Sequence, residues 1–117
     1  MPPVHADRIY KLLTSQHWQQ MRMHGQFDGS PDDQRDGFIH LSLGSQLAGT
    51  LARHYAQTTD LLVLEIDTDN LGAALRLEAS RSGALFPHLY APLPMTACTP
   101  IAWRQQADGE WQPLKLS

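Results

Sequence analysis

The run of residues 61–67 constrains the fold of this chain more than any other segment. It reads Leu-Leu-Val-Leu-Glu-Ile-Asp, and its first four residues are all apolar. Successive side chains of a strand point to opposite faces of a sheet, so this strand is apolar on both faces. Such a strand belongs in the interior of a sheet. We therefore expect the chain to build a sheet around residues 61–67.

Five further segments have the composition or the alternation of strands. One of them, residues 75–79, alternates cleanly, which places its leucines on the inner face and Arg76 and Glu78 on the other. Pro87 cannot donate a hydrogen bond to a neighbouring strand, so its segment is predicted as an edge or irregular strand. An Asp108–Gly109 pair predicts a hairpin turn near the end. The five predicted strands are residues 8–13, 37–42, 75–79, 85–90 and 97–105.

Capping residues and apolar spacing predict two helices and one short helical turn. Thr14 suits an N-cap and Gly25 a C-cap, so a helix is expected over residues 15–24. Ser30, followed by proline and two acids, predicts a single helical turn. Residues 43–55 carry an apolar stripe at helical spacing. The order β-α-β-α followed by several strands indicates an α+β fold in one domain over residues 1–117, with its core at about 8–105.

The overall composition argues against several classes of protein. No run approaches the roughly 18 apolar residues of a membrane span, so none is expected. The first residues lack the basic start and apolar core of a signal peptide, and the one cysteine, Cys98, cannot form an intramolecular disulfide. We therefore expect a cytoplasmic protein. The net charge is −3 with scattered basic residues, which argues against binding to bulk nucleic acid. The oligomeric state does not follow from the sequence.

Polar side chains interrupt two otherwise apolar predicted strands. If both strands are regular, three side chains of each fall on one face. Histidine can donate, accept or carry a proton near neutral pH, and a hydroxyl two residues away can reach the same ligand. We infer that both strands face one cleft that binds a small molecule. The side chains are Phe38, His40 and Ser42 on the first strand and Phe86, His88 and Tyr90 on the second.

These residues also have a purely structural interpretation. Ser42 can cap the helix that follows it, and His40 can be a buried histidine with satisfied hydrogen bonds. His88 can simply pack beside a proline. Gln46 and Arg53 are seven residues apart and share a helix face. This face is either a solvated surface, or its side chains support the ligand-binding residues or contact a phosphate of the ligand. The coincidence of two polar pairs in one small domain favours the binding site.

Other kinds of site lack their usual sequence pattern. Ser42 with a histidine and Glu78 or Asp36 has the residue types of a hydrolase triad, but the chain has no Gly-x-Ser-x-Gly turn. The six histidines show no His-x-x-x-His pair or Cys/His cluster, so no metal site is predicted. No Walker loop or Gly-x-Gly-x-x-Gly is present. Cys98 has no basic neighbour to activate it and is expected to be structural.

The chain resembles the DUF952 family over about residues 8–103. The resemblance implies a fold similar to the ADP-ribosyltransferase fold, which is α+β with a split, mostly antiparallel sheet, two or three helices and a central cleft. In true enzymes of that fold the cleft binds NAD. The matching residues are Ile9-Tyr10-Lys11, the helix carrying Trp18, Asp36-Gly37-Phe38-Ile39-His40-Leu41-Ser42, Gln46, Glu78 and Phe86-Pro87-His88-Leu89-Tyr90.

The resemblance also implies roles for individual residues. His40 matches the histidine that binds the ribose beside nicotinamide, and Tyr90 would stack on the nicotinamide ring. Glu78 is the nearest carboxylate for stabilising an oxocarbenium-like transition state. The catalytic candidates are thus His40 and Glu78, and the ligand-binding candidates are Ser42, Gln46, Arg53, His88 and Tyr90.

Two functions remain open at this stage. The first is binding of a nucleotide or NAD-like small molecule, NAD or ADP-ribose among them, with or without ADP-ribosyl transfer or cleavage of the glycosidic bond of NAD. The alternative is a non-catalytic interaction or structural module, in which the same histidines hold loops together and their removal costs stability.

Overall fold

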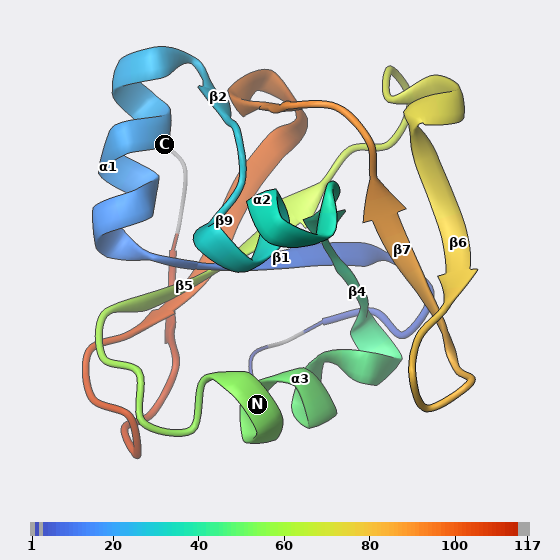
Figure 1. The fold of residues 1–117 in the computed structure, drawn as a ribbon. Coiled ribbons are helices and arrows are strands. Elements are labelled where there is room, and N and C mark those ends of the chain that lie inside the picture. Colours follow the sequence, from blue (N-terminus) through green and yellow to red (C-terminus); the bar gives the residue numbers. More distant parts are fainter. Residues whose placement is uncertain (1, 3, 115–117) are drawn as a thin grey trace.

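The computed structural model of the chain describes residues 2 and 4–114. Its largest sheet is antiparallel throughout, with the strand order β10-β9-β5-β1-β4. β5 lies at the centre of this sheet, as its apolar composition predicts, and β1 and β9 flank it (Figure 1). The strands are β1 (Ile9–Thr14), β4 (Ser42–Leu43), β5 (Leu61–Ile66), β9 (Cys98–Arg104) and β10 (Gln112–Pro113).

A second, three-stranded sheet has the order β3-β7-β6, and a small sheet pairs β2 with β8; all of these pairings are antiparallel. β6 forms the outer edge of the second sheet (Figure 1). The prediction of an α+β fold with mostly antiparallel sheets is confirmed. These strands are β2 (Gln26–Phe27), β3 (Ile39–His40), β6 (Leu75–Ala79), β7 (Leu85–Leu89) and β8 (Leu93–Pro94).

α1 and α2 begin at their predicted N-caps, and α1 ends at its predicted C-cap. Thr14 accepts a hydrogen bond from the His17 backbone at the start of α1 (Ser15–His24), and Gly25 ends it in the left-handed region, with φ of 77°. Ser30 and the third helical residue cap α2 (Pro31–Asp36) reciprocally. α3 (Leu47–His54) follows a short 3₁₀ turn, η1 (Gly44–Gln46). Two more 3₁₀ turns are η2 (Gly72–Ala74) and η3 (Met95–Ala97).

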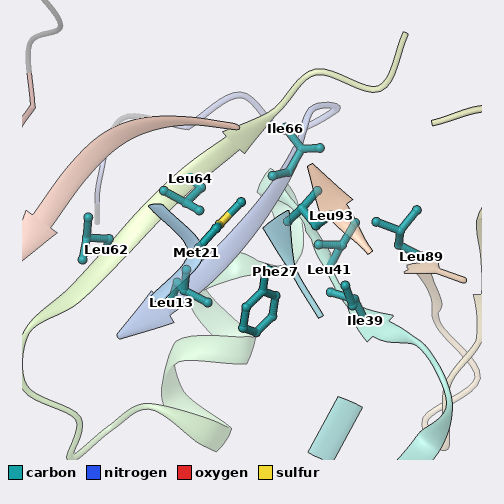
Figure 2. Packing of buried hydrophobic residues seen from close by; sticks show 10 residues of the cluster. All are labelled: Leu13, Met21, Phe27, Ile39, Leu41, Leu62, Leu64, Ile66, Leu89 and Leu93. Atoms are coloured by element: carbon teal, nitrogen blue, oxygen red, sulfur yellow. The ribbon is translucent and has the colours of Figure 1, made fainter. Parts of the chain in front are cut away.

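Both faces of β5 are covered, each by its own apolar cluster. Leu62, Leu64 and Ile66 join one cluster, which lies between the main sheet, α1 and the strands β3 and β7 (Figure 2). Leu61 and Val63 join the second cluster, which lies under α3. Fully burying an aliphatic side chain contributes about 1.5–3 kcal/mol, so the two clusters hold the main sheet from both sides. Within the described residues, no helix has the length and apolarity needed to cross a membrane.

The predicted strand over residues 37–42 is wrong in one respect: it is two short strands in different sheets. β3 pairs with β7, whereas β4 pairs with β1 through Ser42 opposite Tyr10. Leu41 lies between them, 2% exposed, and both it and Ile39 enter the first core cluster. The chain crosses from one sheet to the other here, because this path buries both apolar side chains. Ser42 therefore does not share a regular strand face with His40.

Pro87 was predicted in an edge or irregular strand, and that prediction is also wrong. β7 is the middle strand of its sheet, between β3 and β6. The Leu41 backbone N–H donates to the Pro87 carbonyl at 3.1 Å, so the backbone groups of Pro87 face β3 rather than β6. β3 pairs only with Leu89 and His88 and ends beside Pro87. The missing N–H therefore removes no hydrogen bond from the pairing with β6.

Two smaller expectations about side-chain orientation fail. The leucines of residues 75–79 were predicted to face inward, but Leu77 is 58% exposed. Of these leucines, only Leu75, at the start of β6, packs against the first core cluster, because the rest of the edge strand extends beyond that cluster.

The predicted helix over residues 43–55 begins later than expected, at Leu47. The Ser42 hydroxyl does not cap it, since that hydroxyl lies 2.9 Å from Thr50 Oγ1 inside α3.

Candidate functional site

His40 and His88 stand directly opposite each other in the pairing of β3 with β7. Their ring centroids are 5.8 Å apart. Phe38 stacks on His88 with centroids 3.9 Å apart and an angle of 20° between the rings, and it lies tilted against His40 at 4.7 Å. Tyr90 is tilted against Phe38 at 5.3 Å. We call Phe38, His40, Glu78, His88 and Tyr90 the histidine patch.

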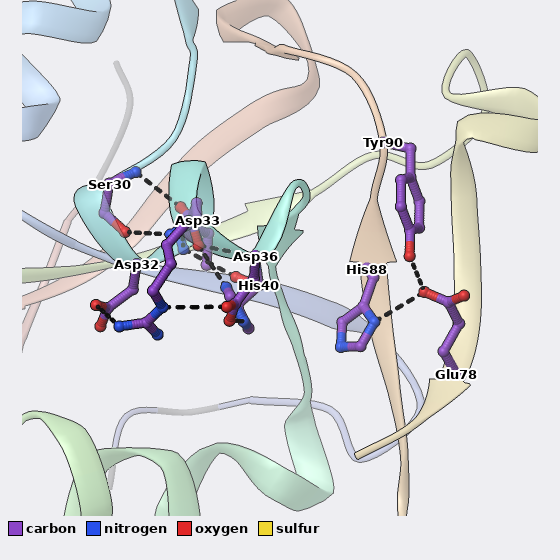
Figure 3. Close-up of polar contacts among 10 residues, drawn as sticks. Ser30, Asp32, Asp33, Asp36, His40, Glu78, His88 and Tyr90 are labelled. Atoms are coloured by element: carbon purple, nitrogen blue, oxygen red, sulfur yellow. Dashed lines mark hydrogen bonds and ion pairs between the residues drawn. The ribbon is translucent and has the colours of Figure 1, made fainter. Parts of the chain in front are cut away.

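Carboxylates engage both ring nitrogens of His40 (Figure 3). Nδ1 lies 2.6 Å from Asp33 Oδ1, and Nε2 lies 3.0 Å from Asp36 Oδ2. The His40 backbone N–H also donates to Asp33 Oδ1. Ionised carboxylate oxygens only accept hydrogen bonds, so both ring nitrogens of His40 face acceptors. This geometry leaves His40 no free nitrogen for a ligand.

Asp33 links His40 to a buried lysine. Lys11 is 5% exposed, and its ammonium donates to the His40 carbonyl at 2.8 Å and lies 3.5 Å from Asp33 Oδ2. Burial lowers the pKa of Lys11, while the negative charge of Asp33 acts in the opposite direction. We call Lys11, Asp33 and His40 the buried ionic cluster. It joins β1, α2 and β3, and thus connects the main sheet to the second sheet.

The environment of Asp33 holds its pKa well below the usual range. Burial alone would raise that pKa, since Asp33 is 3% exposed. The hydrogen bond from the His40 ring, the charge of Lys11 and the backbone N–H groups of Ser30 and His40 outweigh the burial. Asp33 therefore stays ionised in the folded protein, and its charge opposes the lowering of the Lys11 pKa by burial.

His88 has a different set of contacts. Its Nδ1 lies 2.9 Å from Glu78 Oε1, and the Tyr90 hydroxyl donates to the same oxygen at 2.7 Å (Figure 3). Among the described residues, His88 Nε2 has no hydrogen-bond partner, although the residue is only 7% exposed. In the neutral ring, an Nδ1–H donated to a carboxylate leaves Nε2 as an acceptor. The Glu78–His88 pair thus presents one oriented lone pair.

Hydrogen bonds also shift the acidity of the groups around His88. The Tyr90 hydroxyl and then the His88 ring lower the pKa of Glu78 below its ordinary value. The same contact raises the pKa of Tyr90. The guanidinium of Arg76 lies 4.9 Å from the centre of the Tyr90 ring. Glu78 is therefore ionised at neutral pH, and Tyr90 keeps its proton.

The remaining predicted site residues lie apart from the histidine patch. Ser42 is buried, with its hydroxyl on Thr50. The Gln46 side chain accepts from the Leu43 backbone and donates to the Leu85 carbonyl at 2.6 Å, so it ties η1 to the start of β7. Arg53 is exposed on α3. Of the predicted residues, the structure brings together His40, Glu78, His88 and Tyr90.

Sequence reasoning missed the role of Asp33 and gave Asp36 only a discarded one. Asp33 is seven residues before His40, and its one visible signal was the capping motif at Ser30. Its side chain performs two tasks, because Oδ2 accepts from the Ser30 backbone while Oδ1 accepts from His40. Phe38 was noted only as a face neighbour, although it contacts both histidine rings.

Two hollows lie elsewhere on the molecule. One of about 530 Å³ is lined by residues that include Leu51, Arg104 and Trp111. The other, of about 470 Å³, lies around Arg8 and Glu65. Neither is lined by a residue of the histidine patch, which is a shallow, half-exposed surface. Among residues 2 and 4–114, no three or more His, Cys, Asp or Glu side chains are grouped so that they could hold a metal ion.

Comparisons with known proteins identify relatives without an assigned function. The family model described as "Protein of unknown function (DUF952)" matches residues 12–101. The crystal structure of protein CC0527 from Caulobacter crescentus is similar at 38% identity and a TM-score of 0.75, covering 93% of this chain and 87% of that one. Its solution structure gives 38% identity and a TM-score of 0.71, covering 94% and 86%. No curated protein matches the sequence.

Proposed function

The chain belongs to the DUF952 family, and we propose that it binds a small molecule of the nucleotide or NAD type at the histidine patch. The observation that carries this proposal is the oriented, unpartnered Nε2 of His88. Glu78 holds the His88 ring through Nδ1, on the side away from Nε2, and Phe38 covers one face of the ring. Among the described residues, the one buried side-chain polar atom without a hydrogen-bond partner is Arg104 Nε, so Nε2 of His88 remains accessible to water. A ligand N–H or O–H group would take the place of water at this acceptor.

The surroundings of His88 favour a ligand with a planar ring. Phe38 and Tyr90 offer aromatic surface next to Nε2, and Tyr90 is 42% exposed. A nicotinamide carries both a ring for stacking and an amide N–H that would donate to Nε2, and an adenine offers the same combination. Arg76, over the Tyr90 ring, is the nearest cation that would meet a phosphate.

The same groups would suit cleavage of a glycosidic bond, as in ADP-ribosyl transfer. The transition state of that reaction carries positive charge on the ribose, which a nearby carboxylate stabilises. Glu78 is ionised and its side chain is 34% exposed. His88, rather than the initially favoured His40, would accept the proton of the attacking group, because both nitrogens of His40 face carboxylates. The likeness to the ADP-ribosyltransferase fold is part of this proposal.

Thermal unfolding in the presence of ligands tests the binding. The candidates are NAD, NADP, ADP-ribose, nicotinamide and simple nucleotides. A ligand at 100 times its Kd stabilises the protein by about 2.7 kcal/mol, which raises Tm by several degrees. The His88→Ala variant should lose this shift. The control variant His24→Ala replaces an exposed histidine at the end of α1 and should keep the ligand-induced shift in Tm.

The competing function is a non-catalytic interaction or structural module. The observation in its favour is the buried ionic cluster, where His40 holds α2 against the sheet. If no candidate ligand shifts Tm while His88→Ala still lowers stability, the histidines are structural and the binding proposal is wrong. If a ligand binds, analysis of the products formed from NAD separates binding from ADP-ribosyl transfer.

A further inference from the structure

The outer edge of β6 is open and carries apolar side chains. β6 is the last strand of its sheet, and Figure 1 shows no ribbon beyond it. Leu77 on this strand is 58% exposed, and Leu85 at the start of β7 is 53% exposed. An open edge with exposed leucines is a template for another strand, and proteins usually block such edges with charged side chains, above all lysine, with proline or with a bulge. Residues 75–79 contain no lysine, proline or bulge, and their two charged side chains, Arg76 and Glu78, have opposite signs.

The alternation of hydrogen bonds determines which residues of β6 can pair outward. The Ala74 carbonyl accepts from the Tyr90 backbone, and the Ser80 backbone N–H donates to the Ala84 carbonyl. The register between these two bonds is regular. Even-numbered residues of β6 therefore point their N–H and C=O groups toward β7. Leu77 and Ala79 point both groups outward, away from the sheet, whereas Leu75 offers only its carbonyl, because its N–H donates to the Gly72 carbonyl.

We propose that β6 pairs antiparallel with β6 of a second copy of this chain, about a two-fold axis at Leu77. In this register Leu77 lies opposite Leu77 of the second copy, and Leu75 lies opposite Ala79. The Leu77 pair exchanges two hydrogen bonds. Each Leu75–Ala79 pair adds one, from the Ala79 N–H to the Leu75 carbonyl, because the Leu75 N–H already donates to Gly72. Joined in this way, the two three-stranded sheets become one continuous sheet.

The charges of β6 are the reason for choosing a second copy as the occupant. Arg76 of one copy lies opposite Glu78 of the other, and the two-fold axis creates this pair twice. The two residues form a non-hydrogen-bonded pair, in which side chains approach most closely. Within one copy, Arg76 lies over the Tyr90 ring and its charge acts on Glu78, but it forms no ion pair or hydrogen bond with the described residues, and Glu78 uses Oε1 for His88 and Tyr90. The guanidinium N–H groups and Oε2 have no hydrogen-bond partner among the described residues, so they are available.

Sedimentation equilibrium of the full chain tests the association. The concentration should run from about 1 μM to about 1 mM, because an interface made by one pair of short edge strands is small and therefore weak. The wild type should approach the dimer mass at the highest concentration. Leu77→Pro removes an outward N–H only, which an edge strand tolerates, and should stay monomeric. Leu77→Lys should do the same. Leu85→Lys, an equally exposed leucine one strand further in, should dimerise like the wild type, and circular dichroism checks that each variant is folded.

A charge reversal tests the register. Arg76→Glu places two glutamates opposite each other at both ends of the interface and should raise the dimer Kd at least about tenfold. Arg22→Glu makes the same change of net charge on α1, away from β6, and should change the Kd less. An equal effect of both reversals would assign the weakening to net charge and overturn the proposed register.

Hydrogen exchange at single amides gives a readout without any substitution. The amides of Leu77 and Ala79 should become protected as the concentration rises. Those of Arg76 and Glu78 should be protected at every concentration, because they already pair with β7. A wild type that stays monomeric at 1 mM, or a dimer that survives both Leu77 variants, would overturn the proposal.

Discussion

The two histidines of the second sheet lie 5.8 Å apart, yet their partners differ in a way that separates structure from function. His40 meets carboxylates at both nitrogens, and its main partner, Asp33, is 3% exposed and also faces Lys11. His88 meets one carboxylate, Glu78, whose side chain is 34% exposed. One imidazole has used all its hydrogen-bonding capacity, whereas the other retains Nε2.

This difference suggests a rule for the two histidines: the burial of the partner carboxylate, rather than the burial of the histidine itself, distinguishes a structural histidine from one available to a ligand. His88 is more buried than His40, whose side chain is 40% exposed, but the carboxylate behind His88 stays near water. A buried charge without its partner is costly, so the buried ionic cluster must remain intact for folding. We therefore expect that Glu78 can be altered with little cost to the fold, so that the Glu78–His88 pair would be available to the ligand that we propose.

The largest effect is expected for Asp33→Asn. It leaves Lys11 buried without its counter-charge and should cost about 3–5 kcal/mol of unfolding free energy, measured by urea denaturation at pH 7. Asp36→Asn changes the other carboxylate on His40, which is exposed, and should leave the urea midpoint nearly unchanged. Equal losses in the two variants would contradict the distinction between buried and exposed partners.

The pH dependence of stability should carry the same signature. The folded pKa of Asp33 lies below its ordinary value of 3.8, so the unfolded chain takes up this proton at a higher pH. The contribution of Asp33 is therefore complete above about pH 5 and is lost as pH falls toward the folded pKa, at up to roughly 1.4 kcal/mol per pH unit. The stability gap between wild type and Asp33→Asn should shrink from pH 5 to pH 2.5. A constant gap would show that Asp33 is not the titrating group.

Phe38→Ala should have an intermediate effect, because this ring contacts both histidines. Removing a fully buried phenylalanine costs about 3–5 kcal/mol, and Phe38 is half-buried, so a loss of roughly 1–2 kcal/mol is expected. Phe38→Leu keeps most of the volume and should lose less. If the two variants are equally unstable, the stacking on His88 rather than the filled volume supports the patch.

The smallest effect on stability is expected for Glu78→Ala, with Tm nearly unchanged. The change should appear instead in the tautomer of His88, since the Nδ1–H form loses its acceptor. Long-range ¹⁵N–¹H correlation spectra of the imidazole measure this directly. Glu78→Gln retains an oxygen that can accept from Nδ1 and should keep the tautomer. A Glu78→Ala protein as unstable as Asp33→Asn would remove the contrast between the two histidines.

Much of the fold could be predicted from the sequence, because local signals carry it. Caps at Thr14, Gly25 and Ser30 fixed the ends of α1 and the start of α2, and the doubly apolar run gave the central strand. The site was predicted in part. Two polar interruptions predicted that the strands of His40 and His88 face one cleft, but not that they pair with each other. Ser42 was misplaced because the chain changes sheets at Leu41.

By itself, the sequence determined the residue types, the α+β order and the two histidine strands, since these depend on neighbours along the chain. Only the tertiary structure decided which carboxylate serves which histidine. Asp33 reaches His40 through the turn that follows α2, and Glu78 reaches His88 across the pairing of β6 with β7. Contacts between residues on different elements depend on strand order and on which side chains become buried. No local pattern encodes either, so the distinction between the closed and the open histidine appears only in the folded chain.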